Sequence, residues 1–243
     1  ASGEVLEAGT VLSDIHPARL LPMLGKENRI RPSYAARVGA VPNSCGVLSV
    51  FATVDKKAFP YRNQNHYIID GNDVWTEREE APRPQIVMLS MQAQGGSDVC
   101  EAVSLLCPMS FGEVAKWAGT EIGKRGAEYE AFKQAKAEAA IRSVEARFPG
   151  FRAAIRSIHT ATPLTYENYT GTPQGSAYGM QIDCNDVLGT SFSPETKVGG
   201  LYLTGQNIAI HGALGVVMTA ISTCGALLGR EYTARKIGNS QGQ

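Results

Sequence analysis

The sequence predicts an α+β fold with a mixed or antiparallel sheet, flanking helices and a C-terminal strand–helix segment. Apolar, strand-like runs follow one another between Val47 and Met109, and a helical period replaces them between Ala127 and Phe148. Near the end of the chain, a short apolar strand breaks at Gly205 and a long uncharged helix follows at once. The sheet and the helices thus come from separate stretches, which is typical of α+β proteins.

The composition limits the partners and the compartment. The 243 residues are 43% hydrophobic and 19% charged, which is an ordinary globular balance. The 23 basic and 23 acidic residues cancel, so no basic surface for nucleic acid is predicted. The five cysteines are scattered and form no C-x-x-C pair, which favours reduced thiols in the cytoplasm and no metal site.

The first segment has no signal-peptide pattern and does not begin with Met, so we expect a chain cut from a longer protein. Residues Val11–Ser13 are predicted to end a strand. Asp14 is predicted to cap a short helix that carries Leu20, Leu21 and Leu24. An irregular apolar entry segment fits these residues equally well.

Three apolar runs are predicted to be strands of one sheet, at residues 47–54, 85–92 and 103–109. The sequence Asp70-Gly71-Asn72-Asp73 lies between two further apolar pieces and predicts a turn between strands. Together these segments predict a sheet of about four or five strands.

The stretch 127–148 is predicted to be an amphipathic helix that ends at Pro149-Gly150. Its apolar face carries Ala137, Ile141, Val144 and Phe148. Its charged residues are predicted to form a solvated face, which carries Glu128, Glu138, Arg142 and Glu145.

The stretch 158–180 holds two Thr-Pro steps and is predicted to be an irregular loop. Its glycines let a flat ligand approach the backbone, and its tyrosines can stack on that ligand or donate hydroxyl groups. An ordered loop whose aromatic rings pack on the sheet is the alternative. The residues concerned are Gly171, Gly175, Gly179, Tyr166, Tyr169 and Tyr178.

The stretch Gly199–Gly229 is predicted to form an anion-binding corner, because a glycine turn before a helix presents free N–H groups and the positive end of the helix dipole. Residues 208–229 are long enough to span a bilayer, but they are small and half-polar, so a buried helix is favoured. The four histidines show no ligand spacing, and His211 stands out because it lies at this corner.

These residues carry a family resemblance. The segment 196–215, TKVGGLYLTGQNIAIHGALG, resembles the C-terminal FAD-binding segment of the carotenoid desaturase, carotenoid isomerase and retinol saturase family, and is most similar to the retinol saturase branch. The segment 162–179, TPLTYENYTGTPQGSAYG, resembles the Thr-Pro loop of the same family. A weaker match, VLSDIHPARLLPML at 11–24, is similar to the passage out of its flavin domain.

The resemblance implies four regions. Residues 1–22 leave the FAD-binding domain, residues 23–190 form the substrate-binding domain, residues 191–232 form the C-terminal FAD-binding segment, and residues 233–243 form a polar tail. Nothing in the sequence supplies the G-x-G-x-x-G turn that holds the ADP half of FAD. The chain thus resembles the C-terminal half of such an enzyme, whose missing N-terminal half is an expected partner, and the chain alone is expected to be inactive and to bind little or no FAD.

The resemblance also implies which residues meet the cofactor. Gln206 or Asn207 is expected to hydrogen-bond a ribityl or phosphate oxygen, although the retinol saturase branch has an acidic residue at the position of Asn207. More distant flavoenzymes have one at the position of Gln206. The full expected set comprises Gly205, Gln206, Asn207, Gly212, Ala213, Leu214, Gly215, Tyr178 and Gly179.

The activity implied for the complete enzyme is flavin-dependent oxidation or reduction of a conjugated, apolar polyene or isoprenoid, by saturation, desaturation or isomerisation. Tyr166, Glu167, Tyr178 and His211 are the candidate catalytic residues. NAD(P) as the electron donor and association with a membrane surface are left open, and no transmembrane helix is expected.

Two alternatives are kept. The sheet and the amphipathic helix can form a non-enzymatic module that binds an apolar ligand or a partner, in which case the glycine corner is only packing. A different FAD oxidase, such as a relative of the amine oxidases, has a similar C-terminal segment.

Overall fold

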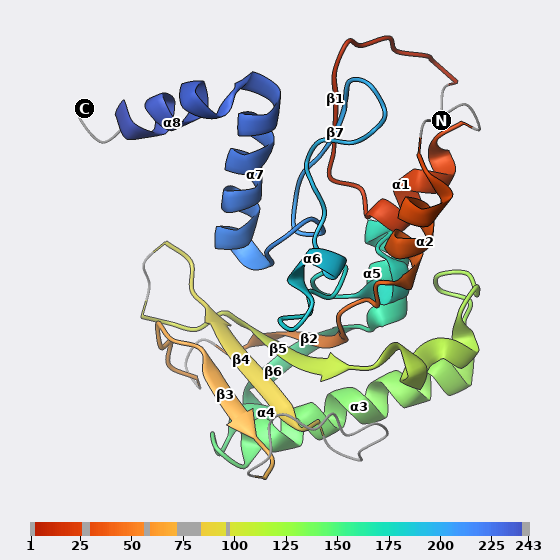
Figure 1. Ribbon diagram of the computed structural model, residues 1–243. Helices are drawn as coiled ribbons and strands as arrows, with labels where there is room; N and C mark the ends of the chain where they lie inside the picture. The colour runs from red at the N-terminus through yellow and green to blue at the C-terminus, as the bar shows by residue number, and fades with distance from the viewer. Residues whose placement is uncertain (1–2, 26–29, 56–58, 72–83, 96–97, 240–243) are drawn as a thin grey trace. The chain divides into compact units, whose positions relative to one another are not determined.

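The computed structural model describes residues 3–25, 30–55, 59–71, 84–95 and 98–239 (Figure 1). The chain divides into two compact units. The sheet unit is Cys45–Ala177, and the terminal unit joins Ala1–Ser44 to Tyr178–Gln243. Compared with the predicted substrate region 23–190, the sheet unit is shorter at both ends.

The sheet unit is built on five antiparallel strands in the order β3-β4-β5-β2-β6. These are β3 (His66–Ile69), β4 (Ile86–Gln92), β5 (Ala102–Met109), β2 (Gly46–Val54) and β6 (Ile155–Ala161). The prediction of an α+β fold with an antiparallel sheet is confirmed. Asp70 and Gly71 of the predicted turn follow β3, whereas Asn72 and Asp73 lie outside the described residues.

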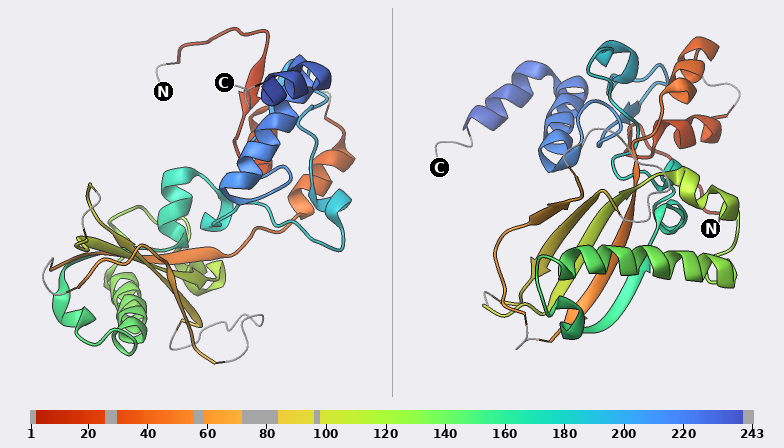
Figure 2. Two further views of the ribbon diagram at one scale, coloured as in Figure 1. Left: turned by 90° about the vertical axis from the view of Figure 1, so that its left-hand side faces the viewer. Right: turned by 90° about the horizontal axis from the view of Figure 1, so that it is seen from below.

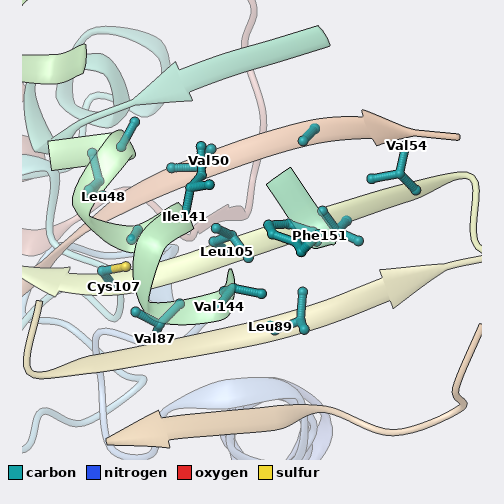
Figure 3. Close-up of a cluster of buried hydrophobic side chains, with 14 of the residues drawn as sticks. Leu48, Val50, Val54, Val87, Leu89, Leu105, Cys107, Ile141, Val144 and Phe151 are labelled. Atoms are coloured by element: carbon teal, nitrogen blue, oxygen red, sulfur yellow. The ribbon is translucent and has the colours of Figure 1, made fainter. Parts of the chain in front are cut away.

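Helix α3 (Ala127–Glu145) lies along one face of this sheet (Figure 2). Every second residue of β4 and β5 is buried, as a sheet with one covered face requires. The predicted face of the helix is confirmed, since Ala137, Ile141 and Val144 are buried and Phe148, beyond the helix, packs on the same core. Figure 3 shows this core, with Leu48, Val50, Leu89, Leu105, Ile141 and Phe151 meeting between sheet and helix.

The predicted solvated face of α3 is confirmed, since Glu128 and Arg142 are exposed and Glu138 and Glu145 are partly exposed, and two of its carboxylates also bind the segment that follows the helix. Glu138 forms an ion pair with Arg152, and Glu145 accepts hydrogen bonds from the backbone N–H groups of Gly150 (2.8 Å) and Arg152 (2.7 Å). Glu145 therefore caps the short helix α4 (Phe151–Ala154). These backbone hydrogen bonds, first that of Arg152, hold the pKa of Glu145 below its ordinary value.

The predicted irregular loop at 158–180 is wrong for its first half. Strand β6 runs into helix α5 (Pro163–Thr170), and a single 3-10 turn, η2 (Pro173–Gly175), follows. Helix α5 begins with a capping box between Thr162 and Thr165, has Pro163 in its first turn and ends at Gly171. These capping signals are present in the sequence, but the Thr-Pro steps and glycines of the same stretch favoured an irregular loop. A second 3-10 segment, η1 (Phe111–Trp117), follows β5.

The terminal unit pairs the two ends of the chain. Strand β1 (Val11–Ser13) lies parallel to β7 (Leu201–Leu203), with Leu12 opposite Tyr202. Around these strands the unit holds α1 (Pro17–Met23), α2 (Pro32–Ala40), α6 (Val187–Thr190), α7 (Gly212–Leu228) and α8 (Arg230–Asn239). Its core contains Leu20, Val38, Met180, Phe192, Leu203 and Ile208.

Three expectations for this unit are tested. The strand predicted at Val11–Ser13 is confirmed, but His16 caps α1, where Asp14 was predicted to do so. The long helix does not follow Gly205 at once, since α7 begins at Gly212. Among the described residues, no helix is long and apolar enough to cross a membrane.

Candidate functional site

The segment Tyr178–Gln181 of the terminal unit carries two of the predicted site residues, and its backbone is bonded along one side to residues 42–44. The Tyr178 amide donates to Ser44 Oγ (3.0 Å), and the Ser44 amide donates to the Gly179 carbonyl (2.8 Å). The Gln181 amide donates to the carbonyl of Pro42 (2.8 Å). Segments far apart in sequence thus hold this stretch extended.

Asn207 holds the same segment from the turn after β7. Its side chain is 7% exposed, and its Oδ1 accepts from the Met180 amide at 3.1 Å. A Cβ atom on Gly179, whose φ is +73°, would lie 1.8 Å from that Oδ1. Position 179 must therefore be glycine for the amide of Asn207 to lie where it does.

His211 and Tyr178 lie together at the start of α7. The Nε2 atom of His211 is 2.8 Å from the Met180 carbonyl oxygen. The rings of Tyr178 and His211 are stacked, with centroids 5.7 Å apart and planes at 23°. Tyr178 is 49% exposed, so part of this residue is accessible to a ligand.

The first turn of α7 suits an anionic or electron-rich group. The N-cap residue of this 17-residue helix, His211, makes no capping hydrogen bond with its side chain, and the first turn holds no acidic residue. Ala213 and Leu214 of that turn are exposed, whereas Gly215 is buried against the carbonyl of Ile210. Unbonded N–H groups and the helix dipole therefore point out of this end.

The glycine turn after β7 packs closely on the end of β1. Gly205 has φ +84°, and a Cβ atom there would lie 3.4 Å from Cβ of Asp14. A mainly apolar cavity of about 370 Å³ lies beside β1 and β7, and among the described residues that line it Asp14 is the one carboxylate. The glycine turn, the start of α7 and the ring stack are chemically suited to the ribityl chain and ring system of a flavin, whereas Asn207 is buried and its Oδ1 already accepts a hydrogen bond from the protein.

Tyr166 and Glu167 lie on α5 in the sheet unit, whereas the other predicted site residues belong to the terminal unit. The Tyr166 hydroxyl shares a 2.6 Å hydrogen bond with Oγ of Ser49, which is fully buried on β2. Glu167 Oε1 accepts from the Gln174 amide at 3.2 Å. Both side chains therefore join α5 to neighbouring parts of its own unit.

Sequence reasoning missed the buried pair of His16 and Asn43 in the terminal unit. His16 is 5% exposed, accepts from the Ala18 amide at Nδ1 (3.2 Å) and contacts Asn43 Oδ1 through Nε2 (2.9 Å). Because Nδ1 accepts, Nε2 carries the proton and donates to Asn43. Burial lowers the pKa of His16 below its ordinary value, the hydrogen bond to Asn43 opposes this, and the charge of Arg19 adds to it. No local pattern predicts this pairing, since 27 residues separate the two side chains.

Comparison with known proteins gives one consistent answer. The chain is 27% identical to the all-trans-retinol 13,14-reductase of Homo sapiens over 223 residues, which cover 83% of this chain and 36% of that protein. It is 25% identical to the protein of the same name from Rattus norvegicus over 229 residues, 86% of this chain and 37% of that protein.

The Danio rerio protein of that name is 23% identical over 85% of this chain. No family model matches the chain. The chain spans just over a third of the length of the curated relatives it matches. The predicted resemblance to retinol saturase-like proteins is thereby confirmed over more than four fifths of this chain.

Proposed function

We propose that the chain forms part of a flavin-dependent oxidoreductase that acts on a conjugated, apolar, retinoid-like polyene. The observation that carries the proposal is the stack of Tyr178 on His211 beside the start of α7. The similarity to proteins named all-trans-retinol 13,14-reductase supports the substrate class and the redox chemistry.

The terminal unit would hold the FAD through its glycine turn and the first turn of α7. The N–H groups after Gly205 would meet the pyrophosphate and ribityl chain, and those of Ala213 and Leu214 would face the ring system. Negative charge on the ring would be stabilised there, because the helix N-terminus carries about half a positive charge. When bound, the flavin supplies hydride transfer, with NAD(P) an open choice of electron donor.

The residues of the chain would orient the substrate and exclude water. Tyr178 offers an aromatic face to a conjugated ligand and a hydroxyl group at its rim. His211 presents an imidazole whose Nε2–H is bonded to Met180, so its Nδ1 atom would be the nitrogen left to accept a hydrogen bond from a ligand. Tyr166 and Glu167 stay candidates for the substrate side, on the sheet unit.

The proposed compartment is a reducing one such as the cytoplasm, because all five cysteines are free. A membrane-surface location stays an open part of the proposal.

The test is expression of the uninterrupted open reading frame that encodes these residues, followed by an absorption spectrum and a turnover assay. We expect bound flavin, and a gain or loss of two hydrogens, or isomerisation, on all-trans-retinol or a carotenoid, detected by mass spectrometry and chromatography. Benzylamine serves as the control substrate, and its turnover with no change in the polyenes would favour an amine-oxidase-like enzyme instead. Absence of both flavin and turnover would contradict the proposal.

A non-enzymatic apolar-ligand module is the second candidate, favoured by the apolar cavity beside β1 and β7. A lipid retained on purification, together with no flavin from the complete reading frame, would support this candidate.

A further inference from the structure

The backbone N–H and the backbone C=O of Met180 both bond to side chains from the segment between β7 and α7, namely Asn207 and His211. We propose that Asn207, acting with His211, is a positioning residue that sets the Tyr178 ring and is not a ligand of the cofactor. The inference rests on the proposed function only in that the Tyr178 ring belongs to the ligand site.

The first step is the pair of bonds to one residue. Asn207 Oδ1 accepts from the Met180 amide, and His211 lies 2.8 Å from the Met180 carbonyl oxygen. Met180 itself is fully buried, so neither bond is exchanged easily for one to water. Two side chains four residues apart in sequence thus clamp one buried residue.

The second step concerns the imidazole of His211. A carbonyl oxygen can only accept, so the Nε2 atom carries the proton and the neutral ring has its lone pair on Nδ1. The clamp therefore selects one tautomer, and with it the orientation of the ring on which Tyr178 stacks.

Asn207 packs directly against the backbone of Gly179. Gly179 leaves no room for a Cβ atom, because that atom would lie 1.8 Å from Oδ1 and 2.8 Å from Cγ of Asn207. On the other flank, Ser44 bonds both Tyr178 and Gly179. The backbone that carries the Tyr178 ring is therefore held from two sides.

The tautomer of His211 in the 243-residue chain is the direct readout, and it needs no flavin. With selective 15N-histidine labelling, long-range 1H–15N spectra at about pH 8, well above the ordinary histidine pKa of ~6.5, report which nitrogen is protonated. His211→Gln assigns the signal. We expect the Nε2–H form in the unchanged chain.

Asn207→Ala removes the acceptor from the Met180 amide and frees the Met180 backbone to move away from His211. We therefore expect the ratio of the Nε2–H to the Nδ1–H tautomer of His211 to fall by up to about five-fold, the factor that loss of the whole His211–Met180 hydrogen bond would give. Gly179→Ala is expected to act in the same way. Asn207→Asp keeps an acceptor oxygen and is expected to keep the ratio. Gln206→Ala, the neighbouring residue, is the matched control and is also expected to leave it unchanged.

An unchanged His211 tautomer in folded Asn207→Ala would overturn the inference. If Asn207→Ala does not fold, hydrogen exchange in the unchanged chain decides, since a Met180 amide that exchanges much faster than the bonded Gln181 amide overturns it equally. In the flavin-loaded protein from the complete reading frame, a positioning role predicts that Asn207→Asp binds FAD within about three-fold of the unchanged protein and that Asn207→Ala mainly lowers kcat. If Asn207→Asp and Asn207→Ala both lose FAD binding while the His211 tautomer stays unchanged, Asn207 is instead a cofactor ligand.

Failure of the proposed function looks different. It would leave the tautomer results as expected, while no variant and no unchanged protein would bind flavin.

Discussion

His16 shows how much one buried side chain contributes in the terminal unit. It caps α1 through Nδ1 and joins the helix to Asn43 through Nε2, and it can do both only as the neutral imidazole. A second proton would remove the cap acceptor and place a positive charge at the positive end of the helix. Asp14, a better cap by residue type, lies two residues too early.

The first prediction concerns pH. Because burial holds the folded-state pKa of His16 below its unfolded value of ~6.5, its contribution to stability is complete above about pH 6.5 and is lost as the pH falls toward the folded-state value. His16→Asn keeps a capping side chain but cannot titrate, so it should lose less stability between about pH 7.5 and pH 5.5. Urea unfolding at the two pH values measures this.

The control for that experiment is His159→Asn, on an exposed position of β6. Equal pH dependence in His16→Asn and the unchanged chain would contradict the prediction.

The second prediction at this scale separates structure from catalysis at Tyr166. Tyr166→Phe leaves Ser49 Oγ buried without its partner and should cost about 1–3 kcal/mol of unfolding free energy. Ser49→Ala added to it should cost little more, so the double-mutant cycle should yield a coupling energy of about 1 kcal/mol. Chemical denaturation of the four proteins measures it, and strictly additive costs would show that the bond contributes nothing.

At the level of elements, the link between α5 and η2 is a site of close packing. Gly175 has φ +55°, and a Cβ atom there would lie 1.8 Å from the Pro163 carbonyl oxygen. Gly171, the C-cap of α5, also has positive φ, at +70°, but nothing lies within 4 Å of its Cβ position. The two glycines therefore share the backbone conformation and differ in the space around them.

The third prediction uses this pair. Gly171→Ala should lower the free energy of unfolding by roughly 1–2 kcal/mol, because alanine must adopt the left-handed backbone conformation there. Gly175→Ala should cost at least about 2 kcal/mol more, because backbone must move to admit the methyl group. The measurement is the thermal midpoint and urea midpoint of both variants, and equal losses would mean that the contact at Gly175 relaxes freely.

At the level of the whole molecule, the proposed flavin site needs more than the corner in the terminal unit. The fit of that corner concerns the ring system and ribityl chain, while the sequence contains no G-x-G-x-x-G turn for the ADP half. Helix α7 also carries exposed apolar residues, among them Leu214 at 76%.

The fourth prediction follows from this. The 243-residue chain, purified and then dialysed after incubation with FAD, should retain much less than one flavin per chain, because most of the binding groups for the ADP half are absent. Absorbance near the flavin bands measures the ratio, with the protein from the complete reading frame as the control. A yellow, stoichiometric complex of the 243-residue chain would contradict it.

Much of the architecture follows from the sequence by itself. Period-two and apolar runs predict β2, β4 and β5, and the 3.6-residue period predicts α3 and its buried face, because these patterns express which side of an element faces the core. The strand at Leu201–Leu203 follows from the short apolar run before Gly205, and the resemblance rests on that same local pattern. The glycine turn at Gly205 does not give the start of α7, which lies at Gly212.

Only the tertiary structure determined the side-chain contacts of the candidate site. The Asn207 and His211 clamp on Met180, the stack of Tyr178 and the bond from Tyr166 to Ser49 join residues 27 or more positions apart. Local pattern carries no information about such pairs, because hydrogen bonding and stacking depend on which segments the fold brings within a few ångströms. The sequence gives the residue types of this corner. Only the packing around them determines which side chains can contact a ligand.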